Sequence, residues 1–210
     1  YDCNIESDWL WVLDPLDGTK DFIQGARNYA MHLGLNYKKK PYIGVVLIPE
    51  KNELWISDGT RCWCEGRDRL KKKLNPVEKD FLNEMTIVTS KNHNNKLLIE
   101  FIEKLGFKNK ISMGSIGCKV ASLLRGESDI YISLSIPKQS CPKDWDFAAP
   151  EAILKSGGGS ITNINNQNLI YLKNNYEQSG IIIASRNKRK HKDICQRIKS
   201  IYEENNFPSL

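Results

Sequence analysis

Long apolar runs, histidine-centred motifs and paired cysteines are absent from the sequence. Its uninterrupted apolar stretches are no longer than five residues, whereas a membrane-spanning helix needs roughly 20, so we expect no membrane span. The three histidines have no carboxylate or cysteine partner in a motif, which gives no support to a histidine-based nucleophile. Apart from Cys62 and Cys64, the six cysteines show no paired spacing, and this favours reduced thiols in a cytoplasmic protein.

Positive charge exceeds negative charge, because 31 lysines and arginines stand against 25 aspartates and glutamates and give a formal net charge of +6. Such an excess favours anionic ligands in general, including nucleotides and phosphates. Aromatic residues do not alternate with the basic clusters as they do in proteins that bind single-stranded nucleic acid, so we expect no nucleic-acid partner. The 210 residues, 40% of them hydrophobic, suffice for one large globular domain or two small ones.

The first part of the chain has the pattern of an antiparallel sheet. Apolar or alternating runs joined by lysine-rich, Asp-Gly and Pro-Glu-Lys-Asn turns predict strands at 9–13, 29–37, 42–48 and 53–57. The polar stretch 66–80 lacks clean periodicity and predicts a loop or linker.

From residue 85 onward, short apolar runs alternate with helical patterns. This alternation predicts strands at 86–89, 129–133 and 180–184 and helices at 94–105, 115–124, 144–155 and 188–204. We therefore expect an α/β chain with an α+β first half, divided into a domain at 1–84, built on the antiparallel sheet, and an α/β domain at 85–210.

The first segment that can carry chemistry is 14–19, which reads DPLDGT. Asp14 and Asp17 lie three residues apart at the end of a predicted strand and can point into one pocket beside the Leu16 carbonyl. Oxygen ligands of this kind suit Mg²⁺ or Ca²⁺ and not zinc. Gly18 and Thr19 can open a helix whose free amides would bind a phosphate oxygen. An Asx turn followed by a helix cap explains the same residues without any site.

The second segment is 144–150, which reads DWDFAAP. It is typical of a helix start, with Asp144 or Asp146 as cap and acidic side chains near the positive end of the helix dipole. A metal pair needs carboxylates from separate parts of a fold, and Asp146 at a helix N-terminus can supply one. The two segments together predict a site for phosphoryl transfer.

Both segments resemble the signatures of one enzyme family. Residues 11–22, WVLDPLDGTKDF, resemble the first signature of the inositol monophosphatase superfamily of Mg²⁺-dependent, lithium-sensitive phosphatases, and residues 145–154, WDFAAPEAIL, resemble the second. Gly114 and Ser115 before a helix, and the stretch 126–131, also resemble family features. The resemblance covers essentially the whole chain and implies a sugar-phosphatase-like layered αβαβα fold.

Within the superfamily, the ending Lys20-Asp21-Phe22 is similar to that of the CysQ-like 3'(2'),5'-bisphosphate nucleotidases, whereas inositol enzymes usually have Thr-Asn-Phe. Inositol enzymes also tend to carry a glutamate shortly after the tyrosine matched by Tyr131, where this sequence reads ISL. The resemblance thus implies removal of the 3'-phosphate from adenosine 3',5'-bisphosphate, with its sulfated precursor PAPS as a second candidate substrate, and a place in sulfate assimilation. The alternatives are an inositol or other sugar monophosphatase and, from another class, a non-catalytic sensor of nucleotides or anions.

The resemblance also implies roles for single residues. The metal ligands would be Asp14, the Leu16 carbonyl, Asp17 and Asp146, holding two or three Mg²⁺ ions that activate the attacking water. Asp17 and Thr19 would be the catalytic residues, with the Thr19 hydroxyl orienting that water. Substrate would be bound by Gly18, Thr19, Ser115 and Lys119, a solvent-facing helix position being the alternative for Lys119.

The family also places an acidic segment, whose glutamate ligates metal, before the first signature. Here Asp2, Glu6 and Asp8 do not form that pattern and lie too close to it. We therefore expect that the N-terminal helical segment of the family is missing from this sequence and that metal binding is weak without it. The expected partners are a small phosphorylated substrate and a second copy of the chain.

Overall fold

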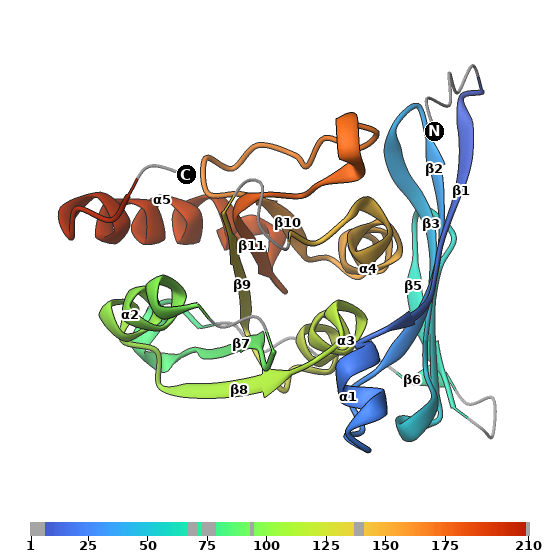
Figure 1. The fold of residues 1–210 in the computed structure, drawn as a ribbon, viewed down its shortest axis with the longest axis horizontal. Coiled ribbons are helices and arrows are strands. Elements are labelled where there is room, and N and C mark those ends of the chain that lie inside the picture. The colour runs from blue at the N-terminus through green and yellow to red at the C-terminus, as the bar shows by residue number, and fades with distance from the viewer. Residues whose placement is uncertain (1–6, 67–70, 73–78, 93–94, 137–140, 209–210) are drawn as a thin grey trace.

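The computed structural model describes residues 7–66, 71–72, 79–92, 95–136 and 141–208. Two β-sheets and two layers of helices alternate through this part of the chain (Figure 1). One helix layer lies between the sheets and the other covers the far side of the second sheet. The mixed α/β class expected from the sequence is confirmed.

The first sheet is antiparallel throughout, and its strands follow one another in chain order. Its strands are β1 (Trp9–Asp17), β2 (Ala30–Tyr37), β3 (Lys40–Ile48), β4 (Glu53–Ser57), β5 (Cys62–Glu65) and β6 (Lys71–Lys72). The four strands predicted in this half are confirmed. The loop predicted at 66–80 contains the two residues of β6 paired with β5, and most of its remaining residues lie outside the described part.

The sequence led us to expect that the first strand ends before Asp14, and this end point was wrong. β1 continues through Pro15 to Asp17, with a shift of register between Asp14 and Asp17 where it pairs with β2. Because β1 is the edge strand of its sheet and the ladder is interrupted there, proline is tolerated without loss of a paired N–H group.

The second sheet is mixed and has the strand order β10-β11-β9-β7-β8. β7 pairs in parallel with β8 and β9, whereas β11 pairs antiparallel with β9 and β10. The strands are β7 (Thr86–Ser90), β8 (Asn109–Met113), β9 (Ile130–Ser135), β10 (Ser160–Asn163) and β11 (Gly180–Ser185). The parallel strands therefore end at a common edge of the sheet.

The four helices predicted after residue 85 have nearly the predicted bounds, and the helix expected to open at Gly18 and Thr19 is the short α1. They are α1 (Thr19–Ile23), α2 (Lys96–Leu105), α3 (Ile116–Arg125), α4 (Asp144–Ser156) and α5 (Lys188–Glu204). Ser115 caps the start of α3, and Gly106 and Gly126 end α2 and α3 in the left-handed conformation that glycine adopts without strain. Short 3₁₀ segments lie at Pro49–Lys51, Leu82–Glu84 and Asn174–Tyr176. No described helix is long and apolar enough to cross a bilayer.

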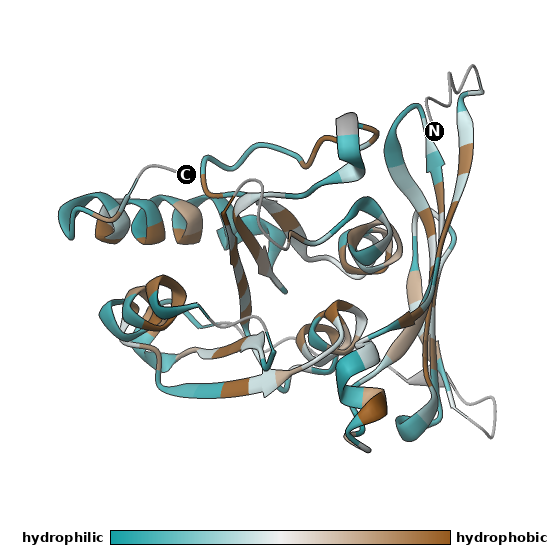
Figure 2. Cartoon of the chain, viewed as in Figure 1, coloured by the Kyte–Doolittle hydropathy of each residue, from teal (hydrophilic) through white to brown (hydrophobic). Residues whose placement is uncertain are grey.

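Helices α3 and α4 lie between the sheets, and α2 and α5 lie on the other side of the second sheet (Figure 1). The apolar sides of α2 and α5 face each other in Figure 2 and share a core with the second sheet. The other core joins α3 and α4 to the inner face of the first sheet. This layering brings the start of α4 opposite β1.

Glycines on the first sheet allow α4 to approach closely. A Cβ atom on Gly44 would lie 2.5 Å from the carbonyl oxygen of Ala149, and one on Gly34 would lie 3.1 Å from the Cβ of Ala148. The small residues on both sides thus permit backbone-to-backbone packing, which fixes the distance between the first sheet and the acidic start of α4.

The other face of the first sheet is apolar across five strands. Trp11 pairs with Leu35, and Leu13 with Leu33, so these side chains share the face opposite to α4. Trp11 is 60% exposed and Leu13 is 56% exposed. We call this the outer face; its residues on β1 to β4 are Trp9, Trp11, Leu13, Met31, Leu33, Leu35, Ile43, Val45, Leu47, Leu54 and Ile56, and Trp63 continues it on β5.

Candidate active site

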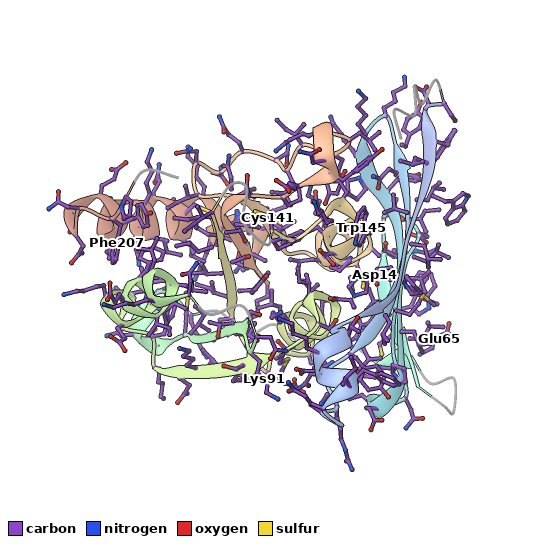
Figure 3. All side chains as sticks on the ribbon, viewed as in Figure 1. Asp14, Glu65, Lys91, Cys141, Trp145 and Phe207 are labelled. Carbon is purple, nitrogen blue, oxygen red and sulfur yellow. The ribbon has the colours of Figure 1, made fainter. Side chains whose placement is uncertain are left out.

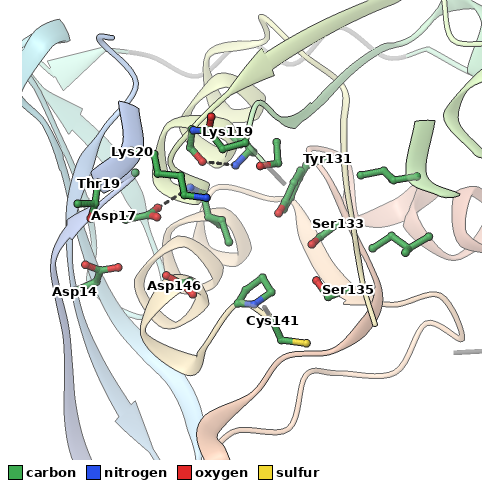
Figure 4. Close-up of a pocket in the computed structure, with 18 of the residues that line it drawn as sticks. Asp14, Asp17, Thr19, Lys20, Lys119, Tyr131, Ser133, Ser135, Cys141 and Asp146 are labelled. Carbon is green, nitrogen blue, oxygen red and sulfur yellow. Dashed lines mark hydrogen bonds between the residues drawn. The ribbon is translucent and has the colours of Figure 1, made fainter. Parts of the chain in front are cut away.

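Three aspartates from two distant segments meet between the sheets. Asp14 and Asp17 lie on β1 on either side of its register shift, and Asp146 lies in the first turn of α4. One carboxylate oxygen of each lies within 4.8 Å of those of the other two. Figure 4 shows the three carboxylates facing one another, and Figure 3 shows Asp14 on the side of the first sheet that faces the helix of Trp145.

The turn from β1 into α1 is closed by local hydrogen bonds. The backbone N–H of Leu16 donates to Asp14 Oδ1 at 2.9 Å, and the Thr19 hydroxyl donates to the Leu16 carbonyl at 2.8 Å. Gly18 precedes the helix with φ of 84°, a conformation that favours glycine. The Asx turn that the sequence offered as an alternative to a site is therefore present, and it coexists with the convergence of the carboxylates.

Asp17 is held by the start of α3. Its Oδ2 accepts hydrogen bonds from the Ser115 hydroxyl at 2.7 Å and from the N–H of Ile116 at 2.6 Å, and His32 Nε2 lies 3.4 Å from the same oxygen. Ser115 is buried, and its Oγ also accepts from the N–H of Cys118 as the cap of α3. Ser115, expected from the sequence beside the substrate, thus contacts Asp17 Oδ2.

The cluster is electrostatically unfavourable without a cation. Burial, with the nearby charge of Asp17, raises the pKa of Asp146 to about 8, and the same two causes raise the pKa of Asp14. A divalent cation would relieve both effects, and hard cations such as Mg²⁺ prefer carboxylate and carbonyl oxygens. The donor set therefore fits the magnesium expected from the sequence.

The neighbouring acid, Asp144, has another role. Its side chain accepts hydrogen bonds from the N–H of Leu172 at 2.7 Å and from Gln178 Nε2 at 2.6 Å. Asp146 Oδ2 instead accepts from the N–H of Lys143 at 2.6 Å, which closes the start of α4. The N-cap of α4 is Lys143, so neither acid is the cap expected from the sequence: Asp146 is the third residue of the helix and closes a capping box, and Asp144 anchors the segment between β10 and β11.

Lys119 is buried and not solvent-facing. Only 1% of it is exposed, and its Nζ donates to the Gly114 carbonyl at 2.7 Å. Burial lowers the pKa of this lysine to about 8. Its ammonium points into the cavity beside the aspartates (Figure 4), so the solvent-facing alternative for Lys119 was wrong.

The aspartates line a cavity of about 620 Å³. It opens at the carboxyl ends of the parallel strands β7, β8 and β9, the edge at which α/β sheets bind ligands. Beyond the predicted residues Asp14, Leu16, Asp17, Gly18, Thr19, Lys119 and Asp146, its lining includes Lys20, Ser90, Asn92, Asn95, Tyr131, Ser133, Ser135, Cys141 and Trp145.

The sequence did not lead us to assign the additional lining residues, from Lys20 to Trp145, to the site. Ser90 and Asn92 follow a predicted strand directly, a signal that could have placed them at this edge. Ser133, Ser135 and Cys141 carry no such signal.

Comparison with known proteins agrees with this geometry. Residues 2–203 match the inositol monophosphatase family. The chain is 30% identical over 196 residues to 3'(2'),5'-bisphosphate nucleotidase 1 of Rattus norvegicus, covering 89% of this chain and 61% of the relative. It is 29% identical over 173 residues to 3'(2'),5'-bisphosphate nucleotidase CysQ of Buchnera aphidicola, covering 81% and 62%. It thus spans less than two thirds of the length of these relatives.

A solved inositol monophosphatase from Zymomonas mobilis superposes with a TM-score of 0.77 at 20% identity, covering 97% of this chain and 74% of that one. This likeness concerns the fold and covers nearly all of this chain. Together with the match along nearly the entire sequence, it confirms the family resemblance of the two acidic motifs: the chain belongs to the inositol monophosphatase family.

Proposed function

We propose that the chain is a Mg²⁺-dependent phosphoric monoester hydrolase that removes the 3'-phosphate from adenosine 3',5'-bisphosphate and accepts PAPS as a second substrate. The observation that carries this proposal is the convergence of Asp14, Asp17 and Asp146 at one end of a cavity that also holds Lys20 and Lys119. The names of the related nucleotidases support the substrate class.

The proposed metal ligands are the carboxylates of Asp14, Asp17 and Asp146 and the Leu16 carbonyl. When bound there, Mg²⁺ supplies Lewis-acid activation of water and of the phosphoryl group. Asp17 keeps its direction through Ser115 and the N–H of Ile116. Thr19, whose hydroxyl lies 2.8 Å from the Leu16 carbonyl, orients the attacking water. The amides of Gly18 and Thr19 contact the phosphate.

The lining beyond the aspartates favours a nucleotide over a cyclic polyol. Along β9 the cavity meets the uncharged side chains of Ser133 and Ser135, in the region where inositol enzymes tend to carry a glutamate. An inositol or sugar monophosphatase remains the second candidate, favoured by the fold of the solved relative. Lithium inhibition, a role in sulfate assimilation, a cytoplasmic location and a homodimer belong to the same proposal.

A non-catalytic anion sensor is the candidate from another class. Three converging carboxylates oppose an anionic ligand unless a cation lies between them. Nucleotide binding that is as tight with a chelator as with Mg²⁺ would favour the sensor, whereas a strict requirement for Mg²⁺ favours the enzyme.

The test is phosphate release from adenosine 3',5'-bisphosphate and from inositol 1-phosphate, each with and without Mg²⁺. We expect faster release from the nucleotide and none without the cation. Asp17→Asn removes a ligand and should lower kcat/KM at least about 100-fold, with an unchanged circular dichroism spectrum. Asp193→Asn, an exposed acid on α5, is the control. Full activity of Asp17→Asn would refute the site, and preference for the inositol substrate would reverse the order of the two phosphatase candidates.

A further inference from the structure

Lys20 lines the cavity, although the aspartate cluster does not use it. It is the second residue of α1, and its side chain is exposed to the cavity rather than packed in the core. Figure 4 shows the Lys20 chain crossing from the first sheet toward Lys119 and Tyr131, on the side of Asp17 away from Asp14. The ammonium groups of Lys20 and Lys119 thus lie in the part of the cavity beyond Asp17 as seen from Asp14.

The direction of Lys20 is fixed by its neighbour. Asp21 is fully buried at 0% exposure, and its Oδ1 accepts a hydrogen bond from Asn92 Nδ2 at 2.7 Å. A Cβ atom on Gly114 would lie 2.5 Å from Asp21 Oδ2, so this carboxylate fills the space above the turn before α3. Because α1 has only five residues, anchoring Asp21 prevents the helix from rotating and keeps Lys20 on the cavity side.

The carboxylates around Lys20 each have one oxygen bonded within the protein, while Asp21 Oδ2 is buried without a hydrogen-bond partner. Asp21 is bonded to Asn92 and lies 3.9 Å from Lys91 Nζ, and Asp17 is bonded to Ser115 and the start of α3. Within the described ranges no carboxylate forms an ion pair with Lys20. The Lys119 ammonium is engaged by the Gly114 carbonyl and its pKa is lowered by burial. Of the two lysines that line the cavity in the described part of the chain, Lys20 is therefore the one whose ammonium is not already bonded within the protein.

We propose that Lys20 determines selectivity for substrates with two phosphate groups: its ammonium, together with Lys119, receives the phosphate that is not hydrolysed. This inference rests on the proposed function and deepens it. The reacting phosphate must lie at the aspartates with their cation. A second dianion is repelled from those carboxylates and is attracted to the lysine side of the cavity.

The test compares substrate pairs that differ by one phosphate. Lys20→Met keeps the length of the side chain and removes its charge. We measure kcat/KM for adenosine 3',5'-bisphosphate and adenosine 3'-monophosphate, and for inositol 1,4-bisphosphate and inositol 1-phosphate. Loss of one charge-assisted hydrogen bond should lower the bisphosphate-to-monophosphate ratio about 10- to 100-fold, mostly through KM. Lys104→Met on α2, an exposed lysine on the far side of the second sheet, makes the same change of net charge and should leave the ratio unaltered.

The outcomes separate this inference from the proposed function. If the wild type hydrolyses only the inositol pair, the nucleotidase proposal fails and the role of Lys20 is read from that pair. If neither pair is hydrolysed, calorimetric dissociation constants for adenosine 3',5'-bisphosphate and the 3'-monophosphate replace the rates. An equal effect of Lys20→Met on both members of a pair, or no effect, overturns the inference.

Discussion

Asp17 is held by the protein through one of its two carboxylate oxygens. Oδ2 accepts from Ser115 and from the N–H of Ile116, so the carboxylate plane is fixed before any cation arrives. Outer hydrogen bonds of this kind typically contribute 10- to 100-fold to metal affinity. Ser115 is therefore assigned as a positioning residue for Asp17.

Ser115→Ala should raise the Mg²⁺ concentration for half-maximal activity about 10-fold or more, because Asp17 loses one of its two donors. The same variant loses the cap of α3, at a cost of about 1 kcal/mol in the free energy of unfolding. Asn187→Ala is the matched control, since Asn187 caps α5 by accepting from the N–H of Arg189. It should lose similar stability and keep the wild-type Mg²⁺ dependence.

A different result for Ser115→Ala would indicate that Ser115 contacts the substrate. If Ser115→Ala raised the KM for the nucleotide and left the Mg²⁺ dependence unaltered, the hydroxyl would act on substrate, as the family resemblance implied. Mg²⁺ binding followed by calorimetry gives the answer independently of turnover.

Among single residues, the aspartates were predictable, whereas their surroundings and the burial of Lys119 were not. Two carboxylates three residues apart, followed by glycine, carry their signal within a short window. The burial of Lys119 leaves no such signal in the sequence. Helix periodicity places a lysine on the solvent side unless it is known that a second sheet covers the helix. Lys119 reaches the Gly114 carbonyl only because α3 lies between two sheets.

At the scale of elements, one buried histidine adds hydrogen bonds to the apolar contact between α5 and the second sheet. His191 lies 2.8 Å from Ser185 Oγ on β11 and 2.8 Å from Thr162 Oγ1 on β10. Burial lowers the pKa of this imidazole from 6.5 to about 4. The folded protein therefore keeps His191 neutral at pH values where the unfolded chain is already protonated.

The free energy of unfolding should fall as the pH drops from about 6.5 to about 4, by up to about 1.4 kcal/mol per pH unit from this group. Above 6.5 both states are neutral at His191, and below about 4 both are protonated, so the contribution is confined to that window. His191→Gln removes the titration and should flatten the stability profile there. Denaturant melts at several pH values provide the measurement.

The exposed neighbour Lys192 supplies the comparison for this element. Lys192→Gln should reproduce the wild-type slope, since it changes charge without touching the buried contacts. A His191→Gln profile as steep as that of the wild type would assign the acid sensitivity to other groups.

The elements with strong periodicity were predictable, and the short edge strands were not. The bounds of α5 agree with its apolar period. β8 was missed because it is an outer strand with mostly exposed residues such as Lys110, so no buried alternation marks it. β10 was missed because it begins directly after the glycines at 157–159, which read as a loop.

At the scale of the whole molecule, the sequence predicts that two acidic motifs share a site, and only the fold explains how. The distance from Asp14 to Asp146 depends on how closely α4 packs on β2 and β3. That approach depends on Gly34 and Gly44 opposite Ala148 and Ala149. Such contacts between segments far apart in the sequence leave no periodic pattern. The two family signatures, however, contain the aspartates that these contacts bring together.

The two faces of the first sheet differ in a way that concerns the entire molecule. Trp55 on the inner face is 1% exposed and belongs to the core with α3 and α4, whereas Trp11 on the outer face is 60% exposed. An apolar surface that extends over several strands binds hydrophobic dyes and promotes association. The 210-residue chain should therefore enhance the fluorescence of anilinonaphthalene sulfonate strongly while folded.

Replacing each tryptophan by alanine tests the two faces in one sheet. Trp55→Ala opens a cavity in the core and should cost about 3 to 5 kcal/mol in the free energy of unfolding. Trp11→Ala should cost less than about 1 kcal/mol, because the Trp11 ring is only partly buried on folding. The same variant should reduce dye binding, because it removes exposed apolar surface. Equal losses of unfolding free energy in the two variants would contradict an exposed outer face. They would mean that Trp11 on β1 is covered in solution as completely as Trp55 is covered on the inner face.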